Sequence, residues 1–215
     1  MPPPAGPGKA PVARKAASDY IRLMAIRPIL LHPDPRLKAV ARPVPAIDDA
    51  LRRLARDMLE TMYDAPGIGL AAPQVGVTSR LVVMDCAKGE EEPRPLVLVN
   101  PEVTWSSEET SPFEEGCLSI PEHFAEVTRP AEVEVRWTGL DGSERRERFG
   151  GLWAVCAQHE IDHLDGRLFI DRIGPIRRQV ITRKMEKLKR DLARDGRGSA
   201  QDARDVAESL RELRA

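Results

Sequence analysis

Several features are scarce in this chain of 215 residues. Its three cysteines, few and odd in number, do not suggest a disulfide framework, so a reducing, cytoplasmic compartment is expected. The formal net charge is −1, which excludes a global field that would attract nucleic acid or a membrane surface. No apolar run approaches membrane-spanning length. The length and composition therefore predict a globular protein with a single core. A monomer is expected, because no exposed apolar stripe requires a partner.

Histidine is also scarce, and two of the four histidines fall in one short motif. Residues 159–163 follow the pattern H-E-x-x-H within a run that indicates a helix. Because residues i and i+4 lie on one helical face, His159 and His163 can bind the same metal ion. Glu160 follows the first histidine, close enough to handle the proton of a metal-bound water. The motif therefore predicts a catalytic metal site.

The residues around the motif predict that it faces inward. Gly150 and Gly151 precede the run and Gly166 follows it, so helix breakers bracket about four turns. A buried pair of histidines with an adjacent carboxylate needs a partner, and a metal ion is the natural one. Apolar residues at spacings of three and four share one stripe with the motif: Leu152, Val155 and Cys156.

The third protein ligand of the metal distinguishes the classes of enzyme that carry this motif. Zinc endopeptidases also carry H-E-x-x-H, but residues 164–169 contain no downstream histidine of the kind that metzincins use. The later glutamates lie among many basic residues that indicate surface. Upstream, Cys117 lies in residues 115–121, a stretch bounded by glycine and proline that is too short for a helix. From the residues alone, Cys117 is either a thiolate ligand or a small buried apolar residue.

Three stretches of the chain together resemble the signature motifs of the peptide deformylase family. They read GIGLAAPQ at 67–74, EGCLS at 115–119 and QHEIDH at 158–163, in the family's order. The resemblance covers approximately residues 24–190. It implies a metal-dependent hydrolase that removes the N-formyl group from the initiator methionine of newly made polypeptides and releases formate.

By this resemblance, Cys117, His159 and His163 hold one divalent metal ion, natively Fe²⁺, for which Zn²⁺, Ni²⁺ or Co²⁺ can substitute. Three protein ligands leave one position open for water, whose pKa the metal lowers toward neutrality. Glu160 is then the general base that forms a metal-bound hydroxide and the general acid for the leaving amine.

The resemblance also assigns an oxyanion site and a substrate site. Gln74 and the backbone N–H of Leu118 are implied to donate to the developing oxyanion. Gly67 and Gly69 leave bare backbone along which a substrate main chain can add as a strand. Glu115 is expected to hydrogen-bond backbone at the pocket rim. The other residues implied to contact the substrate, chiefly around its methionine, are Ile68, Phe113, Gly116, Leu152, Val155 and Cys156.

The periodicity of the chain predicts an α+β fold. Apolar residues repeat at helical spacing over 47–64, which predicts an amphipathic helix. Short apolar runs at 81–86 and 96–99 predict strands, and 132–137 with 143–149 predicts a hairpin. Strands cluster before the metal helix instead of alternating with helices. We therefore expect antiparallel β-sheets packed around a central metal-binding helix, with an N-terminal helix and a C-terminal helix.

Both ends of the chain depart from the family pattern. Residues 1–23 are rich in proline and alanine and carry a basic excess, which predicts a disordered or targeting extension, with Met24 as an alternative initiator. Residues 24–194 are expected to form the deformylase-like catalytic domain. Residues 195–215 are expected to form a C-terminal extension with a short helix.

The segment 171–194 has nine basic and three acidic side chains, a local net charge of +6. The ordinary interpretation is a solvated helix face. The family resemblance implies a second one, docking on the ribosome through attraction to RNA phosphates. Two alternative functions stay open at this point. One is a zinc endopeptidase that shares H-E-x-x-H, and the other is a non-catalytic relative that binds nascent chains or ribosomes.

Overall fold

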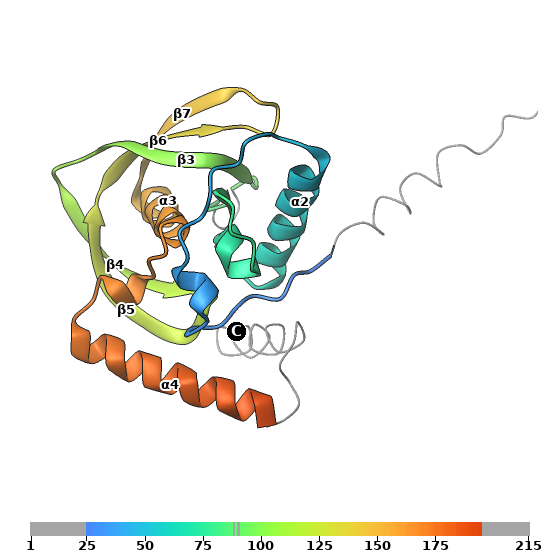
Figure 1. The fold of residues 1–215 in the computed structure, drawn as a ribbon. Coiled ribbons are helices and arrows are strands. Elements are labelled where there is room, and N and C mark those ends of the chain that lie inside the picture. Colours follow the sequence, from blue (N-terminus) through green and yellow to red (C-terminus); the bar gives the residue numbers. More distant parts are fainter. Residues whose placement is uncertain (1–24, 88, 90, 195–215) are drawn as a thin grey trace, which may run out of the picture.

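The computed structural model of the protein describes residues 25–87, 89 and 91–194 (Figure 1). Both expected extensions, at 1–23 and 195–215, lie outside this part of the chain. Within it, no helix has the length and apolar character needed to cross a membrane.

A five-stranded antiparallel sheet and a separate two-stranded antiparallel ribbon form two walls of the molecule. The order of the five strands is β1-β2-β3-β6-β7. The ribbon pairs β4 (Thr110–Cys117) with β5 (Ile120–Pro130). The bounds of the sheet strands are Gly69–Ala71 for β1, Leu81–Met84 for β2, Leu96–Ser106 for β3, Glu132–Thr138 for β6 and Glu144–Gly150 for β7.

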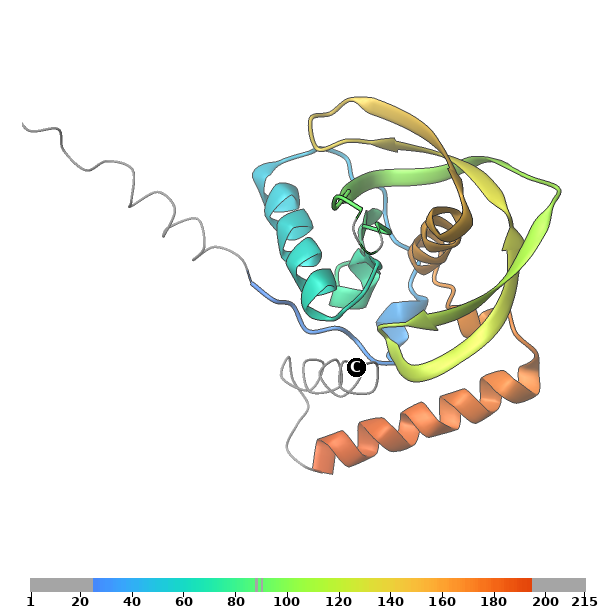
Figure 2. The ribbon, with the colours of Figure 1, turned by 180° about the vertical axis from the view of Figure 1, so that it is seen from behind.

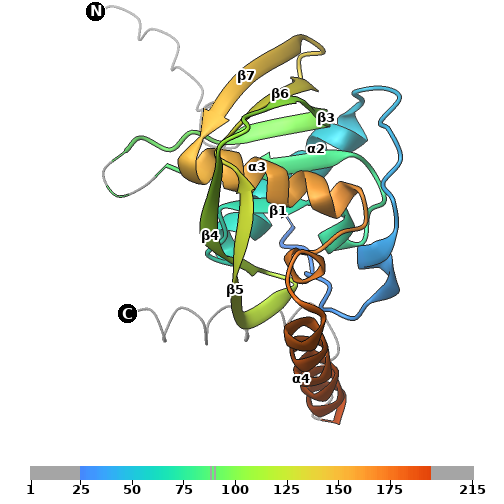
Figure 3. The same ribbon diagram turned by 90° about the vertical axis from the view of Figure 1, so that its left-hand side faces the viewer.

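Three α-helices accompany the two walls in the described part of the chain: α2 (Asp49–Asp64), α3 (Gly151–Leu164) and α4 (Pro175–Arg194). Figure 1 looks along α3, which lies in the middle with β3, β6 and β7 on one side, β4 and β5 on another and α2 on a third. Figure 3 shows α3 lengthwise between the walls, and Figure 2 shows α4 outside them, below β5. The 3-10 helices are η1 (Pro35–Lys38), η2 (Ala72–Val75) and η3 (Phe169–Asp171).

This arrangement confirms the predicted α+β class, with antiparallel sheets around a central helix. Helix α2 forms because its sequence is capped and amphipathic. The Asp48 side chain accepts a hydrogen bond from the backbone N–H of Leu51 at 2.8 Å, which satisfies one free donor of the first turn. Leu54 and Met58 belong to a buried face that packs against β1 and β2. The helix predicted over 47–64 is confirmed except for its first two residues.

Helix α3 is buried almost all round because it lies between the two walls, and ten of its fourteen residues are buried. Glycine ends it. Gly166 has a φ of +71°, and a Cβ there would lie 2.5 Å from the carbonyl oxygen of Lys38. A side chain at this position would therefore meet both backbone strain and a steric clash. The helix predicted between Gly150 and Gly166 is confirmed.

The structure corrects several of the strand predictions. Strand β2 ends at Met84, two residues before the predicted end at Cys86. Strand β3 continues to Ser106, whereas the apolar pattern predicts an end at Val99. The ribbon β4–β5 is not predicted at all as a hairpin, although it carries Cys117. Its inward positions include the charged residues Glu115 and Arg129, so the alternation of apolar and polar residues that identifies a strand is obscured.

Candidate metal centre and substrate pocket

Three donor side chains meet at the centre of the molecule. Cys117 ends β4, while His159 and His163 lie one turn apart on α3. The sulfur and one ring nitrogen of each histidine all lie within 4.8 Å of one another. The Cys117 Sγ lies 3.3 Å from the His163 Nε2. This is the one cluster of its kind in the part of the chain that the structure describes.

A buried carboxylate holds the ring of His159. The Glu115 Oε2 lies 2.8 Å from the His159 Nδ1, so the other ring nitrogen faces the cluster. Burial raises the pKa of Glu115, but hydrogen bonds from Arg129 and His159 outweigh burial and hold the pKa below its ordinary value. Glu115 therefore stays ionised. The expectation that Glu115 bonds backbone at the pocket rim is wrong, because its partners are the buried side chains of Arg129 and His159.

The charge balance of the cluster suits a metal cation. Burial lowers the pKa of His163 well below its ordinary value, and the neighbouring His159 lowers it further, so His163 is neutral and can donate a lone pair. Burial also lowers the pKa of His159, but the Cys117 sulfur and the Glu115 carboxylate outweigh burial and raise it. Groups that stabilise positive charge on this ring also stabilise a cation bound in place of the proton. Sulfur with two imidazoles is a donor set for a divalent transition metal.

Glu160 is buried beside the cluster. Burial raises the pKa of its carboxyl group to about 7, and its Oε2 has no hydrogen-bond partner among the described residues. A Cβ on Gly69 would lie 2.5 Å from the Glu160 Oε1, so only glycine lets strand β1 approach this closely. A carboxyl group with a pKa near neutrality can both accept and donate a proton at physiological pH.

Gln74 lies in η2 with its side chain oriented by two strands. Its Oε1 accepts a hydrogen bond from the backbone N–H of Ala71 at 2.8 Å. Its Nε2 then points the other way, 3.2 Å from the Ser119 Oγ and 3.5 Å from the Cys117 Sγ. Because the residue is only 1% exposed, this amide donor is fixed next to the donor cluster and away from bulk water.

A pocket of about 490 Å³ opens beside the cluster. Every residue predicted for the site lines this pocket except His163, which is fully buried. The pocket also includes His123 and Phe124, so His123 lies at the pocket and outside the donor cluster. The predicted residues that line it are Gly67, Ile68, Gly69, Gln74, Phe113, Glu115, Gly116, Cys117, Leu118, Leu152, Val155, Cys156, His159 and Glu160.

The sequence analysis missed the ionic partners behind the pocket. Arg129 has a side chain only 1% exposed, and it donates hydrogen bonds to both Glu115 and Asp162. One signal was present: Arg129 follows the buried residues Ala125 and Val127 at two-residue spacing, which places it on the inward face of the same strand. A charged residue at such a position indicates a buried partner of opposite charge.

An α+β fold that holds a Cys/His/His cluster beside a buried carboxyl group and an open pocket defines a metal-dependent hydrolase. Comparison with known proteins narrows this class. The family model described as polypeptide deformylase matches residues 26–179. The chain belongs to the polypeptide deformylase family. It is thus a metal-dependent hydrolase that acts on the formyl-amide bond. Membership of this family favours deformylation over the two alternative functions, a zinc endopeptidase and a non-catalytic relative.

Individual relatives agree with the family assignment. A peptide deformylase of Phenylobacterium zucineum is 54% identical over 164 residues, covering 76% of this chain and 97% of the relative. One of Rhizobium meliloti is 55% identical over 164 residues, covering 76% of this chain and 94% of the relative. The crystal structure of a peptide deformylase from Legionella pneumophila is 46% identical with a TM-score of 0.73, covering 79% of this chain and 99% of that one.

Proposed function

We propose that this protein removes the formyl group from the initiator methionine of newly made polypeptides, with Cys117, His159 and His163 as its metal ligands. The observation that carries the proposal is the meeting of these three donors, from β4 and α3, within 4.8 Å of one another beside the buried Glu160. We also propose residues 24–194 as the catalytic domain, because the family match at 26–179 falls inside this range.

The reaction breaks the bond between the formyl carbon and the amine nitrogen. A divalent metal, when bound, activates water and polarises the formyl oxygen. Glu160 accepts the proton of the attacking water and delivers it to the leaving amine, so that formate and a free amino terminus result. The pKa of about 7 that burial gives this carboxyl group suits both transfers near neutral pH.

Gln74 and Leu118 stabilise the charge that develops on the formyl oxygen. The Gln74 Nε2 is fixed next to Cys117 by the bond that its Oε1 accepts from the Ala71 N–H. The backbone N–H of Leu118 follows Cys117 directly in the chain and is the second donor of this proposal. Removing one such donor typically costs about a hundred- to a thousand-fold in rate, which is the loss we expect for Gln74→Ala.

The substrate lies in the pocket between β1 and β4. The bare backbone from Gly67 to Gly69 pairs with the substrate main chain, as in strand addition. Three apolar side chains of α3 that line the pocket receive the methionine side chain: Leu152, Val155 and Cys156. An unbranched thioether suits such an apolar, irregular space.

We propose Fe²⁺ as the native metal, with Zn²⁺, Ni²⁺ or Co²⁺ as substitutes. A thiolate with two imidazoles accommodates all four ions, so the donor set supports a divalent transition metal in general. The family resemblance supports iron among these four metals. Anaerobic purification followed by elemental analysis tests this assignment. Stoichiometric zinc without iron in protein that releases formate would contradict it.

A formate-release assay tests the function itself. The metal-loaded chain is expected to release formate from formyl-Met-Ala-Ser, whereas Glu160→Ala and Cys117→Ala are not. Cleavage of an internal peptide bond is measured in parallel, since a zinc endopeptidase would cleave it without depending on Cys117. Absence of formate release by the metal-loaded wild-type chain would refute the proposal.

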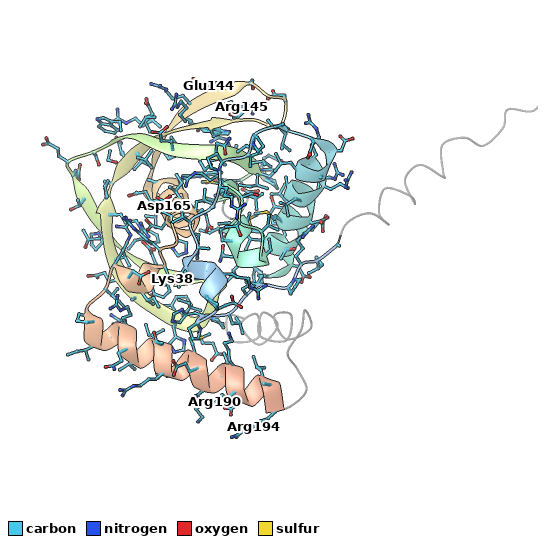
Figure 4. The ribbon with its side chains drawn as sticks, in the orientation of Figure 1. Lys38, Glu144, Arg145, Asp165, Arg190 and Arg194 are labelled. Atoms are coloured by element: carbon cyan, nitrogen blue, oxygen red, sulfur yellow. The ribbon has the colours of Figure 1, made fainter. Side chains whose placement is uncertain are left out.

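We further propose that the basic face of α4 docks on ribosomal RNA. Its support is the exposure of Arg183, Lys184 and Lys187, while the opposite side of the helix buries Ile181 and Met185. Figure 4 shows two further basic residues near the end of α4, Arg190 and Arg194, on the side that faces away from the sheets.

Charge reversal at Arg183, Lys184 and Lys187 tests the docking. The triple variant is expected to lose cosedimentation with ribosomes at low salt while it retains formate release from the short peptide. A matched control reverses three exposed arginines of β7 instead: Arg145, Arg146 and Arg148. Unchanged cosedimentation of the α4 variant would refute docking through this helix.

A further inference from the structure

Four ionised side chains of alternating sign connect His159 to the surface. Glu115 bonds the His159 Nδ1 at 2.8 Å, and Arg129 donates to both Glu115 oxygens at 2.5 and 2.9 Å. Arg129 also donates to the Asp162 Oδ2 at 2.8 Å. Arg172 closes the series, because it donates to Asp162 through two nitrogens at 2.6 and 2.5 Å. The array therefore runs His159, Glu115, Arg129, Asp162, Arg172.

We propose that Arg172 is a positioning residue for the metal centre, which acts on His159 through this array. The inference rests on the proposed role of His159 as a metal ligand. Arg172 lies between η3 and α4, outside the pocket and outside the donor cluster. Its effect therefore passes through the hydrogen bonds of Asp162, Arg129 and Glu115.

Charge balance explains why the outer end of the array matters. Two carboxylates and two guanidinium groups make it neutral, and the inner three side chains are 1–8% exposed. Without Arg172, the carboxylates of Glu115 and Asp162 would share the single guanidinium of Arg129 and leave a buried negative charge. Such an excess is unfavourable in a poorly solvated interior, so the remaining groups rearrange to reduce it.

Hydrogen-bond geometry gives the direction of that rearrangement. The Asp162 Oδ2 accepts from both arginines, whereas its Oδ1 accepts from Arg172. Loss of Arg172 removes that donor from Oδ1 and draws Arg129 toward Asp162. Arg129 then holds Glu115 less firmly, and Glu115 in turn holds the His159 ring less firmly. Groups that orient a ligating imidazole in this way typically change metal affinity about 10- to 100-fold when they are replaced.

Arg172 is also the member of the array that reaches solvent, with 37% of its side chain exposed. A merely structural role is the competing explanation, in which the Arg172–Asp162 pair only anchors the segment that precedes α4. The two explanations differ in what they change. A positioning role changes the affinity and the ligand field of the metal, whereas an anchoring role changes the stability of the fold alone.

The full-length chain loaded with Co²⁺ distinguishes them, because the visible absorption of Co²⁺ reports the geometry of its ligands. For Arg172→Met we expect about a tenfold or larger loss of Co²⁺ affinity in competition with a chelator, together with an altered absorption band. Arg172→Lys keeps the positive charge without the paired hydrogen bonds and should lose less affinity. The matched control is Arg178→Met, since Arg178 is a half-exposed arginine that pairs with Asp171 at 3.6 Å.

Each outcome of this titration decides the question. If the affinity and spectrum of both Arg172 variants match those of Arg178→Met while only thermal stability falls, Arg172 merely anchors the chain and the inference is wrong. If the Cys117→Ser variant binds Co²⁺ as tightly as the wild-type chain, or if the wild-type chain does not bind Co²⁺, the proposed metal centre is wrong and the inference fails with it. Co²⁺ binding that needs Cys117 but ignores Arg172 refutes the inference alone.

Discussion

Helices α3 and α4 both carry ionisable side chains, yet they place them in opposite environments. Helix α3 buries His159, Glu160 and Asp162, whereas α4 buries only Ile181 and Met185. The hydrophobic core surrounds α3 on several sides and touches α4 along one stripe. The difference shows that side chains of similar type meet very different solvation and charge pairing in the two helices.

Burial changes the properties of the charges in α3. Asp162 is held ionised by two arginines, and burial raises the pKa of Glu160 to about 7. Water solvates the charges of α4 directly, so that their individual contributions to stability are small. Substitutions in the two environments should therefore differ in both size and sign.

The largest effect is expected from removing the centre of the buried array. Arg129→Met leaves Glu115 and Asp162 without their shared partner in the interior, which should lower the free energy of unfolding by about 3–5 kcal/mol. Urea denaturation of the metal-free protein measures this loss, with Arg190→Met in exposed α4 as the control. A loss no larger than that of the control would contradict the importance of burial.

A buried charge should also be able to destabilise the fold. Because burial raises the pKa of Glu160 from 4.5 to about 7, ionising this group costs more in the folded state than in the unfolded state. Glu160→Gln removes the cost and should stabilise the metal-free protein by about 3 kcal/mol above neutral pH while it abolishes formate release.

The sign of this effect follows from the two pKa values. Below pH 4.5 the carboxyl group is protonated in both states, so Glu160→Gln should gain nothing; the gain grows as the pH rises to about 7 and is constant above. Melting temperatures of both proteins across this pH range measure it. A gain that is independent of pH would show that ionisation of Glu160 is not its cause.

The smallest effect is expected on α4. Lys184→Glu should change the free energy of unfolding by about 0.5 kcal/mol or less, because the side chain is exposed. Thermal unfolding measures the stability of the variant, and formate release from a short peptide measures its activity; both should stay close to the wild-type values. A loss comparable to that of Arg129→Met would remove the contrast between the buried charges around α3 and the exposed charges of α4.

Much of the central helix could be predicted from the sequence. The glycines at 150 and 166 bound it, and the spacing of four between His159 and His163 places both rings on one face whatever the surroundings. Helix α2 was equally predictable, because its cap and its apolar face are both local features. Local geometry determines these elements, so local sequence is sufficient to identify them.

The partners of the site could not be predicted in the same way. Glu115 was expected to bond backbone, yet it bonds His159, which lies 44 residues away in the sequence. The two-residue spacing of β5 indicates that Arg129 faces inward, but no local pattern identifies Glu115 and Asp162, from two other elements, as its partners. These contacts depend on how β4, β5 and α3 pack, and no short stretch contains that information.

The sequence by itself determined the donor types, the helical register of the two histidines and the family. Only the tertiary structure decided that the Cys117 sulfur meets both rings, that Arg129 neutralises Glu115, and that Glu160 titrates near neutrality. The physical reason is that bonded geometry acts over one helical turn, whereas desolvation and charge pairing depend on every chain segment that surrounds a group.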